Sequence, residues 1–379
     1  MVTFKQCSKA SATLLIVLFV VGLFVGGLAT YYFASRQINN INSQMTTLQN
    51  QVSDLKGFQN ATYQNITILQ NGTSLTALYE GVRNSIVLIE GDTSSGTQQG
   101  SGFIYTFSGR TVVLTNYHVV QGTTGLSVTF SDGNGYSATV LGTDPYSDLA
   151  VLSVSAPASE FKPLEIVSSS TLAVGESVIA IGNPYGLVGS LTTGVVSALG
   201  RTITEDTAGG YSIANIIQTS TPINPGNSGG PLLNAVGNVV GITAAIVINS
   251  QGLGFAIPSN TILREIDALM TTGSYNGHSY LGVVGEDMSY SLAQQTNASV
   301  TYGWRIISVA SEGPSDGKLN VNDIIIALNN QAITNNDNLA SYLEESTLPG
   351  DNLVITVIRG SSQTQVTVVL GARPPPPTT

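Results

Sequence analysis

The chain has 379 residues, which allows two domains because single hydrophobic cores rarely exceed about 250 to 300 residues. Its 23 acidic and 13 basic residues give a formal net charge of −10, which disfavours nucleic acid as a partner. The single cysteine, Cys7, excludes an intrachain disulfide and a thiolate zinc site, and the two histidines, His118 and His278, limit the candidates for a histidine base. We expect no metal and no cofactor.

The N-terminal segment is apolar. No charged residue occurs between Lys9 and Arg36, and residues 14–28 are long enough to cross a hydrocarbon core of about 30 Å as a helix. Lysines precede this segment, so the positive-inside rule places residues 1–10 in the cytoplasm and the rest of the chain outside the cell membrane. We predict a single-pass signal anchor over 11–34, with a cleaved signal peptide as the alternative.

A helical stalk is predicted over 35–75, because apolar residues recur at two heptad positions, as in a coiled coil. These residues are Ile38, Met45, Val52 and Ile66 at one position and Ile41, Leu48, Leu55 and Leu69 at the other. Since Gly57 interrupts the run, a single amphipathic helix lying against the next domain is the alternative. Glycosylation sequons begin at Asn60, Asn65, Asn71 and Asn297, and the cluster of three supports an outward-facing stalk.

From about residue 78 to 258 the sequence consists of short β-rich runs separated by Gly, Asn, Asp and Ser. Many short strands with regular turn signals predict a barrel or a sandwich. The predicted strands include SIVLIEG, GSGFIYT, TVVLTN, LSVTFSDG, LAVLSV, SVIAIGN and VVGITAAIVI. A helix over 259–270, with Ser259 or Asn260 as its N-cap, closes this region.

A smaller α+β unit is predicted after a Gly-, Ser- and Thr-rich linker over 271–277. Its strands lie near GWRIISV, DIIIALN, NLVITVIRG and QVTVVLG, and its helix lies near 336–345. Four prolines at 374–377 predict an extended C-terminal tail.

Three separated motifs carry the residue types of serine acyl transfer, which needs a nucleophile, a base, an orienting carboxylate and backbone donors for an oxyanion. His118 lies in LTNYHVV, Asp148 in DPYSDLAVL and Ser228 in the glycine-rich NPGNSGGPL. Each motif alone is typical of an ordinary turn or strand end. Together, in this order within a β-rich region sized for two six-stranded barrels, they predict a catalytic triad, with Gly226, Asn227 and Ser228 forming the oxyanion hole.

The chain resembles the HtrA/Deg family of trypsin-like serine proteases in GSGFIY, LTNYHVV, DPYSDLAVL, AIGNPYGL, TTGVVSALGR, IIQTSTPINPGNSGGPLLN and GLGFAIPSN. Its C-terminal unit resembles the PDZ domain that follows the protease in that family. The resemblance implies a mainly β fold, a chymotrypsin-like double β-barrel followed by an α+β PDZ domain. It also implies ATP-independent degradation of misfolded or damaged proteins and assembly into trimers or multiples of trimers.

The residue patterns and the resemblance together divide the chain, and the resemblance identifies further segments. The segments are 1–10 (cytoplasmic), 11–34 (anchor), 35–75 (stalk), 76–272 (protease), 278–372 (PDZ) and 373–379 (tail). Segments 183–193 and 200–211 correspond to activation and sensor loops. The YLGV sequence corresponds to the loop that receives a peptide C-terminus, which makes Tyr280, Leu281, Gly282 and Val283 the predicted peptide-binding residues.

The primary specificity pocket is predicted to be apolar. In this protease class the residue six before the nucleophile lies at the pocket base, and here it is Pro222, which cannot pair with a Lys or Arg side chain. The remaining predicted lining residues are Ile223, Thr243, Ala244, Ala245, Ile246 and Phe255. We expect cleavage after small aliphatic residues.

Two other functions fit parts of the sequence. The G-x-S-x-G sequence at 226–230 also fits an esterase nucleophile elbow, with Asp267 and His278 completing a triad. An elbow needs a helix directly after the serine, whereas the following residues are rich in Gly and β-branched side chains; we expect His278 instead to be an exposed linker residue. A membrane-tethered chaperone or scaffold acting through the PDZ domain is the alternative from another class.

Overall fold

The structure of the chain is a computed structural model that describes residues 74–94, 96–183, 189–205, 211–224, 226–244 and 253–375, with scattered residues between 17 and 46. The chain divides into two compact units, Met1–Ile68 and Leu69–Thr379. The described residues of the first unit are helical. Among described residues no helix combines the length and the apolar character that a membrane crossing needs. Most of the predicted anchor, and the sequons at Asn60, Asn65 and Asn71, lie outside the described residues.

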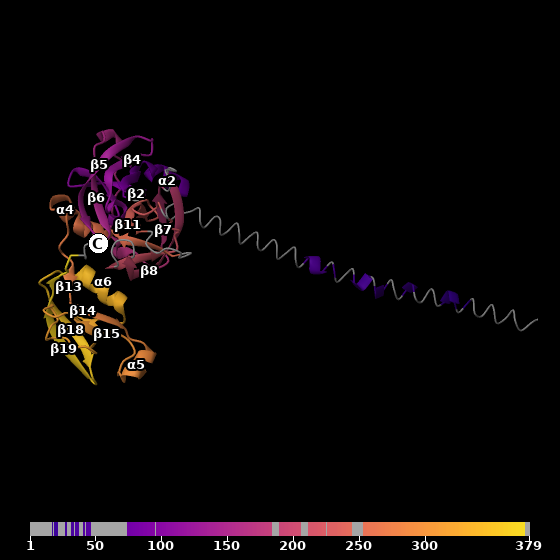
Figure 1. Cartoon of the computed structure of the whole chain (residues 1–379). Coiled ribbons are helices and arrows are strands. Elements are labelled where there is room, and N and C mark those ends of the chain that lie inside the picture. The colour runs from indigo at the N-terminus through magenta and orange to yellow at the C-terminus, as the bar shows by residue number, and fades with distance from the viewer. Residues whose placement is uncertain are drawn as a thin grey trace, which may run out of the picture. The chain divides into compact units, whose positions relative to one another are not determined.

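The N-terminal part of the second unit forms a closed β-barrel, drawn in purple in Figure 1. Its strands follow the order β1-β2-β3-β6-β5-β4. Its strands are β1 Ile86–Thr93, β2 Gly96–Phe107, β3 Arg110–Thr115, β4 Thr124–Thr129, β5 Gly135–Asp144 and β6 Leu149–Val154. Pairing of β1 with β4 closes it. Alternating side chains such as Val87, Ile89 and Leu152 fill its interior, as the period of two in a β-strand dictates.

A second closed barrel follows, with the order β10-β11-β12-β9-β8-β7. Its strands are β7 Ser177–Gly182, β8 Ser190–Glu205, β9 Tyr211–Thr219, β10 Pro231–Leu233, β11 Val239–Ala244 and β12 Gly254–Pro258. Apolar side chains of both barrels, including Phe103 and Ile242, form one cluster between them with Leu269. The prediction of two six-stranded barrels is confirmed.

Short helices cover the barrels. They are α2 Leu75–Val82, η1 Arg83–Ser85, α3 Tyr117–Val120, η2 Ala158–Glu160, η3 Ser169–Thr171 and α4 Ser259–Thr271. Helix α4 contacts β5 and β6 of the first barrel and β11 and β12 of the second. Its predicted N-cap was wrong: Pro258 is the cap, because the Ser259 hydroxyl donates to the carbonyl of Val167 and the Asn260 side chain accepts from the backbone N–H of Ser169.

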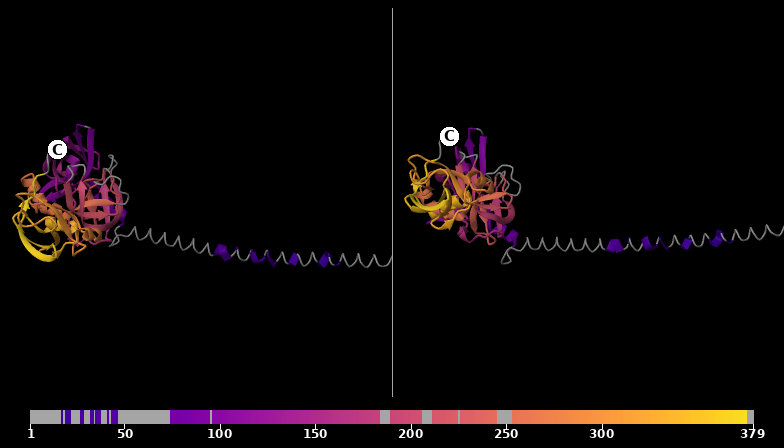
Figure 2. Two further views of the ribbon diagram at one scale, coloured as in Figure 1. Left: turned by 60° about the horizontal axis from the view of Figure 1, so that its bottom comes forward. Right: turned by 90° about the horizontal axis from the view of Figure 1, so that it is seen from below.

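The C-terminal part is an α+β domain, drawn in orange and yellow in both views of Figure 2. Its five-strand path is β14-β15-β16-β18-β19, with β17 paired to β16 and a separate pair β13-β20. The elements are β13 Ser279–Tyr280, β14 Val283–Asp287, α5 Tyr290–Thr296, β15 Trp304–Val309, β16 Ile324–Leu328, β17 Gln331–Ala332, α6 Asn336–Ser346, β18 Asn352–Arg359, β19 Ser362–Val369 and β20 Gly371–Ala372. The four predicted strands and the helix at 336–345 are confirmed.

Helix α6 of this domain also packs on β8 and β9 of the second barrel. In the segment expected to be a sensor loop over 200–211, the described residues are strand up to Glu205 and again from Tyr211, and they belong to the paired strands of the β8–β9 hairpin. The side chain of Asp337 accepts hydrogen bonds from Thr202 N (2.8 Å) and Arg201 Nη1 (3.0 Å) there. The α+β domain is therefore attached to the protease barrel through this hairpin.

Candidate active site

His118 and Asp148 meet because they lie just beyond neighbouring strand ends. His118 is in α3, directly after β3, and Asp148 directly precedes β6, which pairs antiparallel with β3. The ring Nδ1 of His118 lies 2.7 Å from Asp148 Oδ2, and the backbone N–H of His118 donates to Asp148 Oδ1 over 2.8 Å. Both carboxylate oxygens thus hold the same histidine, which fixes the orientation of its ring.

The backbone at Asp148 is held in an unusual conformation. Its φ is +52°, in the left-handed region that Asp tolerates better than most residues, and the residue is 1% exposed. Its carbonyl accepts from Tyr117 N (3.0 Å) and from Asn116 Nδ2 (3.1 Å). Burial, with a further contribution from the Asp148 charge, raises the pKa of the Tyr117 phenol. The carboxylate is thus placed by its surroundings before any substrate arrives.

The turn around Ser228 is shaped by two glycines with positive φ, Gly226 (+96°) and Gly229 (+84°). A Cβ at Gly229 would lie 2.1 Å from the carbonyl oxygen of Ser101, so no side chain fits there. Thr243 of β11 braces the turn, with its hydroxyl 2.7 Å from the carbonyl oxygen of Asn227. Ser228 itself is 6% exposed.

Ser101 of β2 joins this turn to the first barrel. Its N–H donates to the carbonyl of Ser228 (2.7 Å), and its hydroxyl donates to the carbonyl of Gly226 (2.6 Å) while accepting from Asn183 N (2.7 Å). The hydroxyl of Thr115, three residues before the histidine, donates to the Ser101 carbonyl (2.8 Å). The serine turn and the histidine segment are therefore tied to one buried residue across the two barrels. Sequence reasoning gave Ser101 no role, because only the packing of the barrels brings it here.

Comparison with known proteins agrees with this geometry. Residues 100–242 match the family model of the trypsin-like peptidase domain, and residues 279–370 match that of the PDZ domain. The chain is 35% identical over 290 residues to the chloroplastic Protease Do-like 1 of Arabidopsis thaliana, covering 73% of this chain and 64% of the relative. It is 38% identical over 284 residues to the putative serine protease HhoB of Synechocystis sp., covering 73% and 67%.

Solved structures give the same result. The HtrA-type protease AlgW with tripeptide matches with a TM-score of 0.66 and 30% identity, covering 80% of this chain and 99% of that one. The chain belongs to the HtrA/Deg family of trypsin-like serine proteases. Its mainly β protease domain and its PDZ domain are those of the HtrA fold. The chain spans 64% of the length of the Arabidopsis relative and 58% of a probable DegP-like endoprotease of Pseudomonas savastanoi.

The predicted specificity pocket of this HtrA protein is described in part. Thr243 and Ala244 lie on β11 and are buried, and Ala244 pairs with Phe255 of β12. Pro222 is exposed, and its carbonyl accepts from the hydroxyl of Thr192 (3.0 Å). Ile223 is half-buried against the second barrel core. Ala245 and Ile246 lie outside the described residues, as do 184–188 of the predicted activation loop and 206–210 of the sensor loop.

The predicted peptide-binding loop of the PDZ domain joins β13 to β14. The Leu281 side chain is buried in the domain core and its carbonyl accepts from the hydroxyl of Ser315 (2.6 Å), so this residue can offer a ligand its backbone N–H rather than its side chain. Gly282 has a φ of +76°. Within the described sheet, β14 stands at one edge of the strand order, the position at which an added peptide strand can pair.

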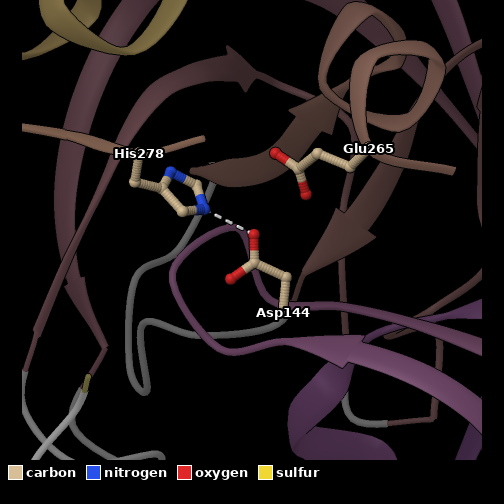
Figure 3. A group of neighbouring side chains, drawn as sticks. All are labelled: Asp144, Glu265 and His278. Atoms are coloured by element: carbon tan, nitrogen blue, oxygen red, sulfur yellow. Dashed lines mark hydrogen bonds and ion pairs between the residues drawn. The ribbon is translucent and has the colours of Figure 1, made fainter. Parts of the chain in front are cut away.

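A second ionisable cluster lies at the junction of the two domains (Figure 3). Ligand-type atoms of Asp144, Glu265 and His278 all lie within 4.8 Å of one another. The expectation that His278 is exposed was wrong, since the residue is 5% exposed and its Nε2 lies 2.5 Å from Asp144 Oδ2. A guanidinium, that of Arg264, lies 2.6 Å from Glu265 Oε1. This close cation and the direct His–Asp contact favour an ion-pair network over a metal site.

Proposed function

We propose that this chain is a serine endopeptidase whose catalytic triad is Ser228, His118 and Asp148. The observation that carries the proposal is the double contact of Asp148 with the ring and the backbone of His118, beside a serine turn tied to the same barrel. An aspartate in this position holds the histidine in the tautomer that a general base needs. Membership of the HtrA/Deg family supports the same assignment.

In the proposed mechanism Ser228 Oγ attacks the scissile carbonyl while His118 accepts its proton. The imidazolium that forms is stabilised by Asp148 and then protonates the leaving amine, which releases the first product. Water then attacks the acyl-enzyme while His118 accepts its proton, and His118 returns that proton to Ser228 Oγ as the ester bond breaks and the second product leaves. The amides of Gly226 and Ser228 receive the oxyanion, and the Ser101 hydroxyl positions this hole by holding the carbonyl of Gly226.

The proposed substrates are unfolded or misfolded polypeptides, and the PDZ domain is proposed to bind peptide C-termini. Structures of the relative AlgW are described with a tripeptide and with a decapeptide, which supports a peptide ligand here. The edge strand β14 and the loop at 280–283 are the proposed peptide site. The exposed Pro222 and the apolar β11 and β12 residues carry no acid to attract Lys or Arg, so preferred cleavage after basic residues in a peptide library would contradict the pocket.

We propose further that the protease works outside the cytoplasm, anchored by residues 11–34, in protein quality control. Relatives are named as probable periplasmic endoproteases, which supports the compartment. Assembly into trimers, or into multiples of trimers, stays a prediction from the resemblance and from the heptads. Comparing the mass in detergent of the full chain and of a chain lacking residues 1–75 tests the contribution of the stalk.

The deciding experiment measures casein degradation by the wild type and by Ser228→Ala, with the exposed Ser291→Ala as matched control. Labelling by a fluorophosphonate probe reports the nucleophile separately. We expect Ser228→Ala to lose degradation and labelling, and Ser291→Ala to keep both. If both variants degrade casein equally, the assignment of Ser228 is wrong. If the wild type neither degrades nor labels, the tethered chaperone or scaffold becomes the better interpretation.

A further inference from the structure

The turn that carries Asp148 is organised by another aspartate, Asp144, at the end of β5. Asp144 Oδ1 accepts from the backbone N–H of Tyr146 (2.9 Å), and its Oδ2 accepts from the hydroxyl of Ser147 (2.9 Å). The turn closes with a contact from Asp148 N to the carbonyl of Pro145 (3.3 Å). Since Asp148 follows directly in the left-handed conformation, its position depends on how Asp144 is held.

His278, the first residue of the PDZ segment, contacts Asp144 and holds it in place. Its Nε2 lies 2.5 Å from Asp144 Oδ2, and its Nδ1 lies 3.2 Å from Glu344 Oε2 on α6 of the PDZ domain. With a carboxylate at each ring nitrogen, the imidazole donates on both sides and carries a positive charge. The ring of Tyr146 lies edge-on to that of His278, with centroids 5.4 Å apart. One side chain thus joins the aspartate turn of the protease to the PDZ helix.

Glu265 and Arg264 of α4 complete the cluster. Ser147 Oγ lies 2.9 Å from Asp144 Oδ2 and 2.6 Å from Glu265 Oε2, and since a hydroxyl has one proton, one of the two carboxyl groups carries the other. We assign that proton to Glu265, because Asp144 already faces the imidazolium of His278. Burial, followed by the charge of Asp144, raises the pKa of Glu265 well above its ordinary value, which keeps that proton in place. Arg264 pairs with Glu344 and Glu265. With Glu265 neutral, two carboxylates face two cations, and loss of His278 would leave one negative charge buried without its partner.

The end of the PDZ domain reaches the same turn. The guanidinium of Arg373 lies 3.9 Å from the centroid of the Tyr146 ring, and the phenol of Tyr146 donates to the carbonyl of Pro374. The backbone N–H of Arg373 donates to the carbonyl of His278 (3.0 Å). Two sets of contacts from the PDZ domain therefore meet at residues 144–147, immediately before the proposed catalytic aspartate. One set is made by His278, and the other by Arg373 and Pro374.

We propose that His278 is a positioning residue for catalysis, which fixes the turn 144–148 through Asp144 and so makes the placement of Asp148 depend on the docked PDZ domain. The proposal rests on the proposed function of Asp148. Under this proposal the turn 144–148 couples the two domains. This coupling is separate from the contact of α6 with the β8–β9 hairpin.

The test compares wild type with His278→Gln, which keeps a side-chain N–H donor group but not the charge, and with His278→Arg, which keeps the cation. The matched control is Ser341→Ala, which removes another contact between the domains, the hydrogen bond from Ser341 Oγ to the carbonyl of Gly200. For a short chromogenic peptide we expect kcat of His278→Gln to fall about 10- to 100-fold with KM nearly unchanged, because small displacements of catalytic groups have effects of this size. His278→Arg should recover part of the loss, and Ser341→Ala should stay within twofold of wild type.

A second readout does not need activity. Since the chain has two histidines, histidine-labelled full-length protein gives one imidazole signal for His118 in the His278→Gln variant. We expect the Nδ1 proton of His118, bound to Asp148, to broaden or move upfield in that variant and to stay unchanged in Ser341→Ala. An unchanged proton together with an unchanged kcat overturns the proposal. Loss of wild-type activity in EDTA and its recovery in Zn²⁺ would also overturn the proposal, because the cluster would then be a metal site. If wild type lacks Ser228-dependent activity, the proposed function fails, while the proton signal still decides whether His278 positions Asp148.

Discussion

The chain has two histidines, and each one meets an aspartate of the same five-residue segment, 144–148. His118 contacts Asp148 through Nδ1 and keeps 18% of its side chain exposed, whereas His278 contacts carboxylates through both nitrogens and keeps 4%. A catalytic base has to exchange a proton during each turnover. A ring enclosed between two carboxylates holds its proton and works as a fixed cation. The same pair of residue types therefore gives the proposed base in one place and a structural ion in the other.

The largest expected effect distinguishes the contribution of Asp148 to kcat from that of Asp144. Asp148→Asn should lower kcat about 10⁴-fold, because the amide favours the wrong tautomer of the base. Asp144→Asn removes charge from the turn without touching His118 and should lower kcat only about 10- to 100-fold. Steady-state kinetics on one peptide substrate, with circular dichroism to verify folding, measure both. Equal losses in the two variants would contradict the division of roles.

A pH titration of stability sharpens the comparison. Burial opposes the charge of His278, but its hydrogen bonds to Asp144 and Glu344 prevail and raise its pKa from 6.5 to about 10. A group whose pKa is higher in the folded state contributes stability that is complete below the unfolded pKa and is lost as the pH rises to the folded one. The free energy of unfolding should therefore decrease from about pH 6.5 to about pH 10.

Other groups around His278 also contribute to the pH dependence of the free energy of unfolding. They are Asp144, Tyr146, Glu265, Arg264, Tyr275, Glu344 and Arg373. Asp144 and Glu344 have pKa values that are lowered by His278 against the opposing effect of burial, so their contribution is lost only in acid. Urea unfolding between pH 6.5 and 10 should show a shallower slope for His278→Gln than for wild type. Parallel slopes would show that His278 keeps its ordinary pKa.

The smallest expected effect concerns Glu265. Because its pKa is raised well above the ordinary value, Glu265→Gln imitates the neutral form and should change the free energy of unfolding at neutral pH by less than about 1 kcal/mol. Glu265→Ala removes one buried partner from Ser147, which keeps Asp144, and one from Arg264, which keeps Glu344, and should cost about 1 to 3 kcal/mol. Thermal or urea unfolding of the two variants measures the difference. A larger loss in the Gln variant would mean that Glu265 is ionised in the fold.

Local pattern predicted the fold well where the residues concerned interact nearby in sequence. The strand runs with turn signals gave both barrels, and the helix at 336–345 follows the Asn335 cap. It failed for the cap of α4, where Ser259 and Asn260 bond to residues about 90 positions away. It failed again for His278, because a Gly- and Ser-rich flank predicts exposure while the contacts that bury it lie 134 and 66 residues away.

The proposed triad was accessible from sequence because each member lies in its own short motif. Ser101, Ser147 and Glu265 were missed, since a buried serine on a strand or a glutamate on a helix has no distinctive neighbours. A charged residue among buried apolar positions of α4 was the one available signal: Glu265 lies on the same side of the helix as Ile262, Ile266 and Leu269. A buried carboxyl group requires partners, but the sequence does not say which.

The ion network also limits where the protease domain of this protein can be joined to a C-terminal domain from another protein. A stretch rich in Gly, Ser and Thr, such as 271–277, is where an engineer would exchange one C-terminal module for another. In this chain Glu265 before the stretch and His278 after it belong to one buried assembly with Glu344 of the PDZ helix. A chimera joined within 271–277 would keep Asp144, Glu265 and Arg264 but lose His278 and Glu344, unless the incoming module supplies a histidine and a glutamate at matching positions.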